Sequence, residues 1–300
     1  MASILPPVAI FCFKRVDAFR NLIGSLIECD RSSELRVYIY SDGPQSESDV
    51  ETIREVRNYA RSIAGFQEIT IIEHDVNLGL ANNIISGVTE ILLIHDRIVV
   101  LEDDLVVAPN FLNYMASALA FYKDHQQVGG ISGFSLDLYN LQSIEKDSYV
   151  LGRPSSWGWA IWRDRWQKID WELRASDCAG YKLRRDFNSY GGPDLSRMLD
   201  SYFNGKSNSW AIRWCFHVFR QRQIIIYPKK SLVLNLGFSD PDSTHGKGHN
   251  FYVTTLDSTQ HSRRYDFESN LELRKILNAE FKWRYSRPFK LITKVKDWFL

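Results

Sequence analysis

Three adjacent carboxylates, Glu102, Asp103 and Asp104, follow an apolar run of strand length at residues 98–101. Because like charges at the end of a buried strand repel one another, we expect a cation to lie opposite them. Carboxylate oxygens are the ligands that Mg²⁺ and Mn²⁺ prefer, and such ions keep coordination positions open for phosphate. The pattern therefore indicates a divalent cation that acts as a Lewis acid on a departing diphosphate. The alternative interpretation is a solvated strand end.

Short apolar strands alternate with amphipathic helices around this triplet. The expected strands lie at 8–13, 35–40, 68–74, 97–102 and 223–228, and the expected helices begin near residues 17, 47 and 80. Asp17 is predicted to cap its helix, and Pro109 to be the first residue of another. The alternation predicts an α/β fold with a mostly parallel sheet that helices cover on both faces. In such folds ligands bind beyond the carboxyl ends of the strands, where the triplet lies.

The composition limits the class of protein. The 300 residues are 44% hydrophobic, which suits one continuous domain, and a net charge of +1 gives no general attraction to nucleic acid. The four cysteines are scattered without a CxxC pair, so neither a disulfide framework nor a zinc site is expected. The sequence has no signal-peptide pattern and no apolar run of membrane-spanning length. We therefore expect a soluble cytoplasmic protein.

The segment VVLEDDLVVAPNFLNYM, residues 99–115, resembles the E-D-D-L-x-V-A-P-[DN]-F-F segment of the N-acetylglucosaminyltransferase I family. VAIFCFKR and VYIYSDGP fall where that family places its first two strands. The resemblance covers residues 8–135, is looser over 155–252, and extends to bacterial family 2-like glycosyltransferases. It implies a GT-A, Rossmann-like sheet with an elaborated acceptor-side half, a nucleotide-sugar donor (a UDP-sugar), and Mn²⁺ or Mg²⁺ as cofactor.

Residue by residue, the resemblance implies that Asp104 binds the metal directly. Asp103 would contact the sugar or ribose, and Glu102 the donor sugar or the hydrogen bonds of the cluster. The other donor-side residues that it implies are Lys14, Arg15, Asp42, Asn77 and Gly79. The alternative for the two basic residues is plain solvation, and the alternative for the glycine is an ordinary turn.

The second half resembles the acceptor side of these enzymes less completely. SSWGWAIW resembles a glycine–tryptophan segment beside the donor sugar and acceptor, which implies acceptor binding by Trp157, Gly158 and Trp159; core tryptophans are the alternative. An inverting transfer needs a carboxylate base for the acceptor hydroxyl. The family carries acidic residues between two tryptophans, but SWAIRW has none, so Asp194 is the substitute that we consider for the base. Inversion is favoured over retention.

A polar stretch, DPDSTHGKGHNF at residues 240–251, resembles the family's S-H-G segment. It implies that His245 is a further metal ligand, with His249 as the alternative, and that Lys247 contacts phosphate. A neutral imidazole is a suitable ligand for Mn²⁺.

The last twenty residues, 281–300, interleave basic and aromatic side chains. The pattern suits a helix that lies on an anionic membrane surface, and a helix docked on the domain is the alternative. We expect a catalytic domain at 1–255, divided into a nucleotide-sugar half (1–135) and an acceptor half (136–255), followed by a helical tail at 256–300. The protein would then be cytoplasmic and peripheral on the inner face of the plasma membrane.

These observations favour a hexosyl- or N-acetylhexosaminyltransferase that acts on a glycan or lipid-linked acceptor in bacterial surface polysaccharide synthesis. Two other functions were considered. A sugar-nucleotidyltransferase should carry a glycine-rich phosphate loop after its first strand, and FCFKRVDAF has none. A non-catalytic glycan-binding protein would explain the tryptophans but would leave the acidic triplet without a purpose.

Overall fold

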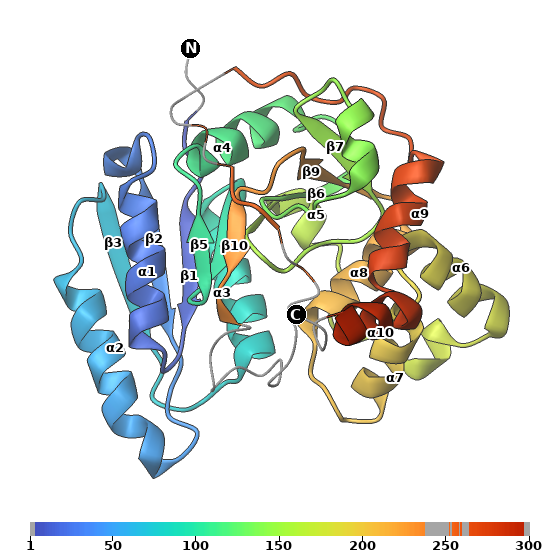
Figure 1. Cartoon of the computed structure of the whole chain (residues 1–300). Helices are drawn as coiled ribbons and strands as arrows, with labels where there is room; N and C mark the ends of the chain where they lie inside the picture. The colour runs from blue at the N-terminus through green and yellow to red at the C-terminus, as the bar shows by residue number, and fades with distance from the viewer. Residues whose placement is uncertain (1–3, 238–251, 253, 258, 260–263, 297–300) are drawn as a thin grey trace.

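The computed structural model describes residues 4–237, 252, 254–257, 259 and 264–296. Eight strands form one sheet in the order β3-β2-β1-β4-β8-β6-β9-β7 (Figure 1). They are β1 (Val8–Cys12), β2 (Arg36–Ser41), β3 (Glu68–Glu73), β4 (Arg97–Glu102), β6 (Val128–Ser132), β7 (Ser148–Leu151), β8 (Trp159–Trp162) and β9 (Ile224–Pro228). The strands β3, β2, β1 and β4 run parallel, as do β6 and β9, while β8 and β7 pair antiparallel with their neighbours. The predicted α/β fold with a mostly parallel sheet is confirmed.

Helices cover both faces of this sheet. They are α1 (Val16–Ile27), α2 (Val50–Ser62), α3 (Leu80–Ile94), α4 (Phe111–Phe121), α5 (Arg163–Trp166), α6 (Tyr181–Gly191), α7 (Leu195–Phe203), α8 (Trp210–Arg220), α9 (Lys275–Arg284) and α10 (Arg287–Lys296). Figure 1 shows α1 and α2 in front of the parallel strands, with α3 behind them. The apolar side chains of α1 recur at helical spacing and face the sheet, because burial of that stripe is what stabilises a surface helix.

The parallel register brings the chemistry-bearing residues to one edge. In the sheet, Phe11 of β1 lies opposite Glu102 of β4, and Cys12 lies opposite Ser41 of β2. The segments that leave these three strands therefore begin side by side. A small antiparallel pair, β5 (Leu105–Val107) with β10 (Val233–Asn235), continues the chain beyond β4 at the same edge.

Two predicted helix starts are wrong by one or two residues. The helix α1 begins at Val16, so Asp17 lies inside the first turn, where it pairs with Arg20 instead of capping the helix. A carboxylate there still favours the helix, because the amino-terminal turn carries partial positive charge. The helix α4 begins at Phe111, so Pro109 precedes it. The Pro109 carbonyl accepts a hydrogen bond from the backbone N–H of Asp30.

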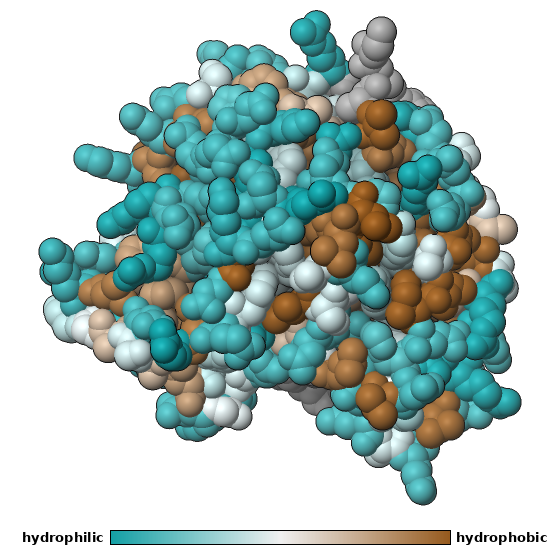
Figure 2. Space-filling model, turned by 180° about the vertical axis from the view of Figure 1, so that it is seen from behind, coloured by the Kyte–Doolittle hydropathy of each residue, from teal (hydrophilic) through white to brown (hydrophobic). Residues whose placement is uncertain are grey.

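The segment beyond residue 255 packs into the main core rather than standing apart from it. Tyr265, Phe267, Leu277 and Phe281 all belong to the same buried cluster as the central strands. The helix α9 is thus docked on the domain, while the membrane-surface helix within 281–300 and the boundary at 255 stay predictions. Seen from behind, the surface carries separate apolar patches among hydrophilic side chains (Figure 2). In the described part of the chain, no helix combines the length and hydropathy that a bilayer crossing requires.

Candidate active site

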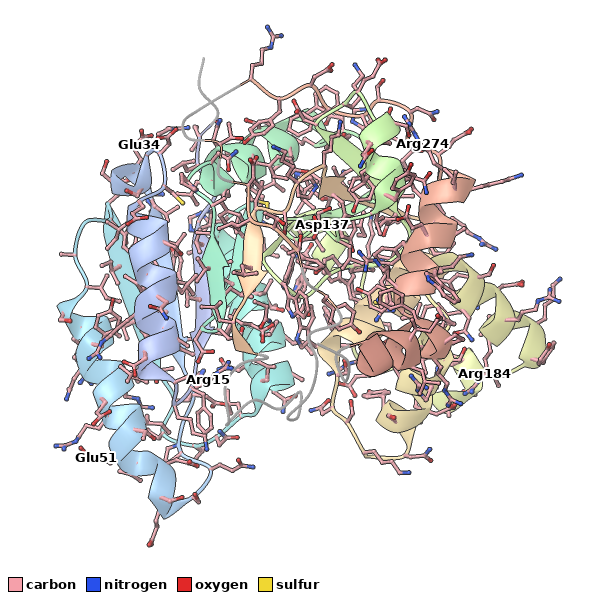
Figure 3. All side chains as sticks on the ribbon, viewed as in Figure 1. Arg15, Glu34, Glu51, Asp137, Arg184 and Arg274 are labelled. Atoms are coloured by element: carbon pink, nitrogen blue, oxygen red, sulfur yellow. The ribbon has the colours of Figure 1, made fainter. Side chains whose placement is uncertain are left out.

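Arg15 lies opposite the acidic triplet. Its Nη1 donates to Asp104 Oδ2 at 3.1 Å, and its Nη2 donates to Asp103 Oδ1. The backbone N–H of Phe13 donates to the second oxygen of Asp103 at 3.2 Å. Figure 3 shows Arg15 at the end of β1 where these groups meet. In this structure the cation that faces the triplet is therefore the guanidinium of Arg15.

One arginine does not balance three carboxylates. Desolvation, followed by repulsion from Asp104 and Asp103, raises the pKa of Glu102 well above its ordinary value. Desolvation also raises the pKa of Asp103 to about 6, because the attraction of Arg15 does not offset the burial and the repulsion from Asp104. Burial opposes the charge of Arg15, yet the two aspartates outweigh it and raise the arginine's pKa. The edge thus holds a surplus of negative charge that a further cation would relieve.

Asn235, at the end of β10, supplies an oxygen beside Asp104 that sequence reasoning missed. A Cβ at Gly237 would clash with Asp104 Oδ2 and would lie 3.0 Å from Asn235 Oδ1, so this glycine lets both oxygens approach its backbone, and Asn235 Oδ1 accepts from the Gly237 N–H at 2.7 Å. The backbone of Leu236 donates to the Asp104 carbonyl at 2.8 Å and holds the two segments together. The sequence signal that could have indicated this site is an asparagine followed by Leu-Gly at the end of an apolar run.

The donor set at this edge fits a hard divalent cation, since carboxylate and amide oxygens are its preferred ligands. Among the residues that the structure describes, no group of three His, Cys, Asp or Glu side chains is arranged to hold a metal. The predicted metal ligand His245, its alternative His249 and the predicted phosphate contact Lys247 lie outside the described residues. Asp104 and Asn235 are the described residues that would contribute to such a site.

Asp42 joins two loops of the predicted donor pocket. Its Oδ1 accepts from the backbone N–H groups of Gly43 (2.9 Å) and Leu78 (2.8 Å), and its Oδ2 accepts from Gly79 (3.0 Å). Asn77 Nδ2 donates to the Gly43 carbonyl at 2.9 Å. The structure therefore brings Asp42, Asn77 and Gly79 together. Gly79 is bonded to Asp42 directly, and Asn77 is bonded to Gly43, the residue after Asp42. Their contact with a donor stays a prediction.

Two further basic residues shape the same region. Lys14 Nζ pairs with Asp49 at 3.1 Å, so it faces the start of α2 and not the triplet. Arg57 of α2, which sequence reasoning missed, donates to the His74 carbonyl at 2.6 Å and to Ser41 Oγ at 3.2 Å. It thereby ties the ends of β2 and β3 beneath the pocket.

The tryptophan segment divides between core and surface. Trp159 is fully buried and packs against Trp166 and Trp214, with ring centroids 5.7 and 4.9 Å away. It has no surface to offer an acceptor, so the core alternative holds for it. Trp157 is half-buried beside Phe134. Gly158, between the two tryptophans, has a φ of +60° that favours glycine.

Asp194 is fully engaged in an ion pair. Its two oxygens accept from Arg153 Nη1 at 2.7 Å and Nη2 at 3.2 Å, and the Tyr285 ring packs on the guanidinium at 4.0 Å. A carboxylate with both oxygens bonded to a buried arginine is poorly placed to take an acceptor's proton. The SWAIRW segment opens α8, where Arg213 donates to the Trp171 carbonyl at 2.9 Å. The ion pair with Arg153 argues against Asp194 as the general base.

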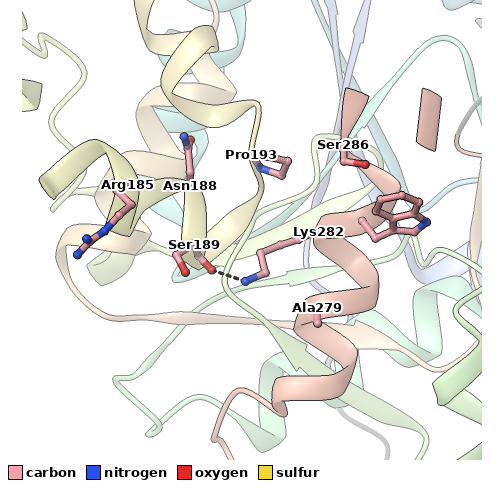
Figure 4. Close-up of a pocket in the computed structure, with 8 residues that line it drawn as sticks. Arg185, Asn188, Ser189, Pro193, Ala279, Lys282 and Ser286 are labelled. Atoms are coloured by element: carbon pink, nitrogen blue, oxygen red, sulfur yellow. Dashed lines mark hydrogen bonds between the residues drawn. The ribbon is translucent and has the colours of Figure 1, made fainter. Parts of the chain in front are cut away.

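A cavity of about 430 Å³ lies between α6 and α9 and shares no residue with the acidic edge (Figure 4). Its lining includes Arg185, Lys282 and Trp283, and Lys282 donates to the Ser189 carbonyl at 3.0 Å. The cavity is therefore a basic and aromatic surface feature on the acceptor-side half.

Comparisons with known proteins were made against family models, curated sequences and solved structures. A model of the family described as "Glycosyl transferase family 2" matches residues 8–187, which include the whole acidic edge except Asn235 and Gly237. No curated protein sequence gives a significant match.

Similar solved structures include S. aureus TarS 1-349, with 12% identity and a TM-score of 0.41 over 78% of this chain and 61% of that chain. They also include the mannosyltransferase PcManGT from Pyrobaculum calidifontis in complex with GDP-Man and Mn²⁺, with 14% identity and a TM-score of 0.39 over 71% of this chain and 74% of that chain. This chain thus spans less than two thirds of the TarS structure.

Proposed function

Because the chain belongs to glycosyl transferase family 2, we propose that it moves a sugar from a nucleotide-sugar donor to a hydroxyl of a glycan or lipid-linked acceptor, with the help of a divalent cation. The observation that carries the cation dependence is the charge surplus at the acidic edge, where, among the described residues, Arg15 is the basic side chain that pairs with Asp103 and Asp104. The likeness to the N-acetylglucosaminyltransferase I family and the choice of a UDP-sugar belong to the same proposal.

Asp104, with Asn235 beside it, would hold Mn²⁺ or Mg²⁺, and His245 is proposed as a further ligand. When bound, the ion supplies a Lewis acid that stabilises the departing nucleoside diphosphate. Asp103 keeps its bond from the Phe13 backbone and orients its other oxygen toward the donor. Glu102, for which desolvation raises the pKa, is placed to accept or share a proton with a sugar hydroxyl.

The donor pocket gains its shape from the loops that Asp42 and Arg57 tie together. Such backbone-anchored walls position a ligand without moving, which lowers the entropic cost of reaching a reactive geometry. Lys14 is proposed to contact the donor from its pair with Asp49, since its side chain is 38% exposed. On the acceptor side, half-buried Trp157 and the tight turn at Gly158 are proposed to bound the sugar acceptor.

The two other functions are less well supported. The turn after β1 carries Phe13, Lys14 and Arg15 in place of the glycines of a nucleotidyltransferase phosphate loop. A glycan-binding protein needs exposed aromatic faces, whereas Trp159, Trp166, Trp210 and Trp214 are buried. The tryptophans therefore serve mainly as core.

We also propose that the α9–α10 surface contacts an anionic membrane. Trp283, Leu291 and Ile292 are 47%, 67% and 49% exposed, and Lys282 and Arg185 line the same cavity as Trp283 (Figure 4). Apolar side chains beside basic ones suit an anionic interface. Leu291→Asp combined with Ile292→Asp should reduce sedimentation with phosphatidylglycerol vesicles and leave it unchanged with phosphatidylcholine vesicles. Equal binding of the variant and the wild type to the anionic vesicles would contradict this part of the proposal.

The activity is tested by a nucleotide-release screen of donor sugars with Mn²⁺ and with EDTA. We expect release with at least one donor and a loss of release with EDTA or in Asp104→Ala. The matched control is Asp17→Ala, which removes an exposed carboxylate from α1 and should keep full activity. Full activity of Asp104→Ala with an active donor would show that the assigned metal ligand is wrong.

A further inference from the structure

We propose that Arg15 is an exchange residue: it holds Asp103 and Asp104 while the cation site is empty, and it moves onto the donor's diphosphate when a divalent cation binds. This inference rests on the proposed function, because it assigns a second partner to a residue at that same site. It adds that the Arg15 side chain weakens the binding of the divalent cation and strengthens the binding of the diphosphate.

The geometry places Arg15 in competition with a divalent cation. Its Nη1 lies 3.1 Å from Asp104 Oδ2, the oxygen of the proposed metal ligand that approaches the Gly237 backbone beside Asn235 Oδ1. A guanidinium and a divalent ion on one carboxylate oxygen repel each other strongly at such short separations in a partly buried site. Arg15 must therefore leave Asp104 when the oxygen accepts a metal.

The local structure allows that departure. The Arg15 side chain is 22% exposed, whereas those of Asp103 and Asp104 are 4% and 9% exposed. The carboxylates are thus fixed by their surroundings, and the arginine is the partner with room to move. Asp103 retains its hydrogen bond from the Phe13 backbone when Arg15 leaves, so one of its oxygens stays satisfied. The Arg15 backbone is anchored because its carbonyl accepts the Phe19 N–H at 3.0 Å in the first turn of α1.

The charges explain where the arginine goes. Three carboxylates and one guanidinium leave the empty edge negative, which repels a diphosphate. A divalent ion removes that repulsion and frees a guanidinium that forms bidentate bonds with phosphate oxygens. The other nearby cations are committed elsewhere, with Lys14 on Asp49 and Arg57 on the His74 carbonyl. Of the basic side chains in the described part of this edge, Arg15 is the one in contact with the triplet.

Exchange predicts opposite effects of one substitution on two ligands. Arg15→Met should strengthen the binding of Mn²⁺ alone by about tenfold, because the internal competitor is gone. The same substitution should weaken the binding of UDP at saturating Mn²⁺ by about tenfold, because the diphosphate loses a charge-assisted partner. A side chain that merely stabilised the fold would not shift the two affinities in opposite directions.

The experiment is isothermal titration of Mn²⁺ alone, followed by UDP at saturating Mn²⁺, into the wild type, Arg15→Met and Arg20→Met, after circular dichroism shows that each is folded. Arg20→Met removes the same charge from the exposed pair with Asp17 on α1 and should bind Mn²⁺ within about threefold of wild type. If wild type binds Mn²⁺ but Arg15→Met binds it equally or more weakly, the exchange is overturned and the proposed function stands. If no form binds Mn²⁺, with or without UDP, the cation dependence fails and the exchange fails with it.

Discussion

Two buried clusters of arginine and aspartate lie in the two halves of the molecule, and they differ in charge balance. In the C-terminal half, Arg153 meets Asp194 one to one, both side chains are about 10% exposed or less, and Tyr285 covers the guanidinium. At the acidic edge, Arg15 meets Asp103 and Asp104, and Glu102 adds a third carboxylate, which leaves a surplus of negative charge among the described residues. A balanced pair is complete without a ligand, whereas a surplus needs one. The comparison therefore assigns stability to the first cluster and ligand binding to the second.

The largest expected effect lies in the balanced pair. Asp194→Asn should lower the free energy of unfolding by about 3–5 kcal/mol, because it leaves the Arg153 guanidinium buried without a charge partner. Urea denaturation measures this loss. The control is Asp200→Asn in α7, the helix that begins directly after Asp194, because the solvent-accessible pair of Asp200 with Arg184 should contribute less than about 1 kcal/mol. An Asp194→Asn protein of wild-type stability that had lost transfer would restore Asp194 as the general base.

The second effect belongs to the surplus. Asp104→Asn should reduce sugar transfer by about 100-fold, or about 2.7 kcal/mol, because the cation loses its charged ligand. Its melting temperature should stay equal to or above that of the wild type, since one of three repelling carboxylates is removed. Nucleotide release and thermal denaturation measure the two quantities. A variant that lost stability in proportion to activity would mean that both clusters serve the fold.

The difference between the clusters also explains what the sequence could predict. The triplet is contiguous and follows a strand, so its place at the carboxyl edge of a parallel sheet could be predicted from pattern alone. Arg153 and Asp194 meet only through tertiary packing, and nothing in the sequence joins them. The same holds for Asn235, which reaches Asp104 only because β10 pairs with β5.

Burial was the second property that pattern could not supply. Trp157 and Trp159 lie two residues apart in one segment, but Gly158 turns the chain between them with a φ of +60°, and only Trp159 reaches the core while Trp157 stays half-buried. Arg15 was expected in the nucleotide pocket, but its contact with the triplet depends on how the β1–α1 turn is closed. Sequence spacing does not fix such a turn.

A third prediction tests how tightly the donor edge is built. Gly43→Ala should destabilise the protein by about 1–3 kcal/mol, because a Cβ there would lie 2.6 Å from the Val76 carbonyl oxygen. Gly24→Ala in α1 is the control, since no atom lies within 4 Å of its Cβ position and alanine favours a helix. Chemical denaturation should show opposite signs for the two variants. Equal stabilities would mean that the loop joined by Asp42 adapts at little cost.

The smallest expected effect is a pH dependence of the metal-free protein. Burial raises the pKa of Asp103 in the folded protein to about 6. At pH values between the ordinary aspartate pKa and about 6, the folded state therefore binds more protons than the unfolded state. Stability in EDTA should therefore fall as the pH rises from about 4 to about 6, by an amount on the order of 1 kcal/mol. Asp103→Asn should flatten that slope. A slope of the opposite sign would mean that Arg15 balances the triplet after all.

The central claim is that the surplus at the donor edge binds a nucleoside diphosphate through a divalent cation. Isothermal titration of UDP, and of GDP in parallel, into the wild-type protein with Mn²⁺ and with EDTA tests it most directly. We expect at least one nucleotide to bind at least about tenfold more tightly with Mn²⁺. Equal affinity in Mn²⁺ and EDTA, or no binding of either nucleotide, would contradict the account.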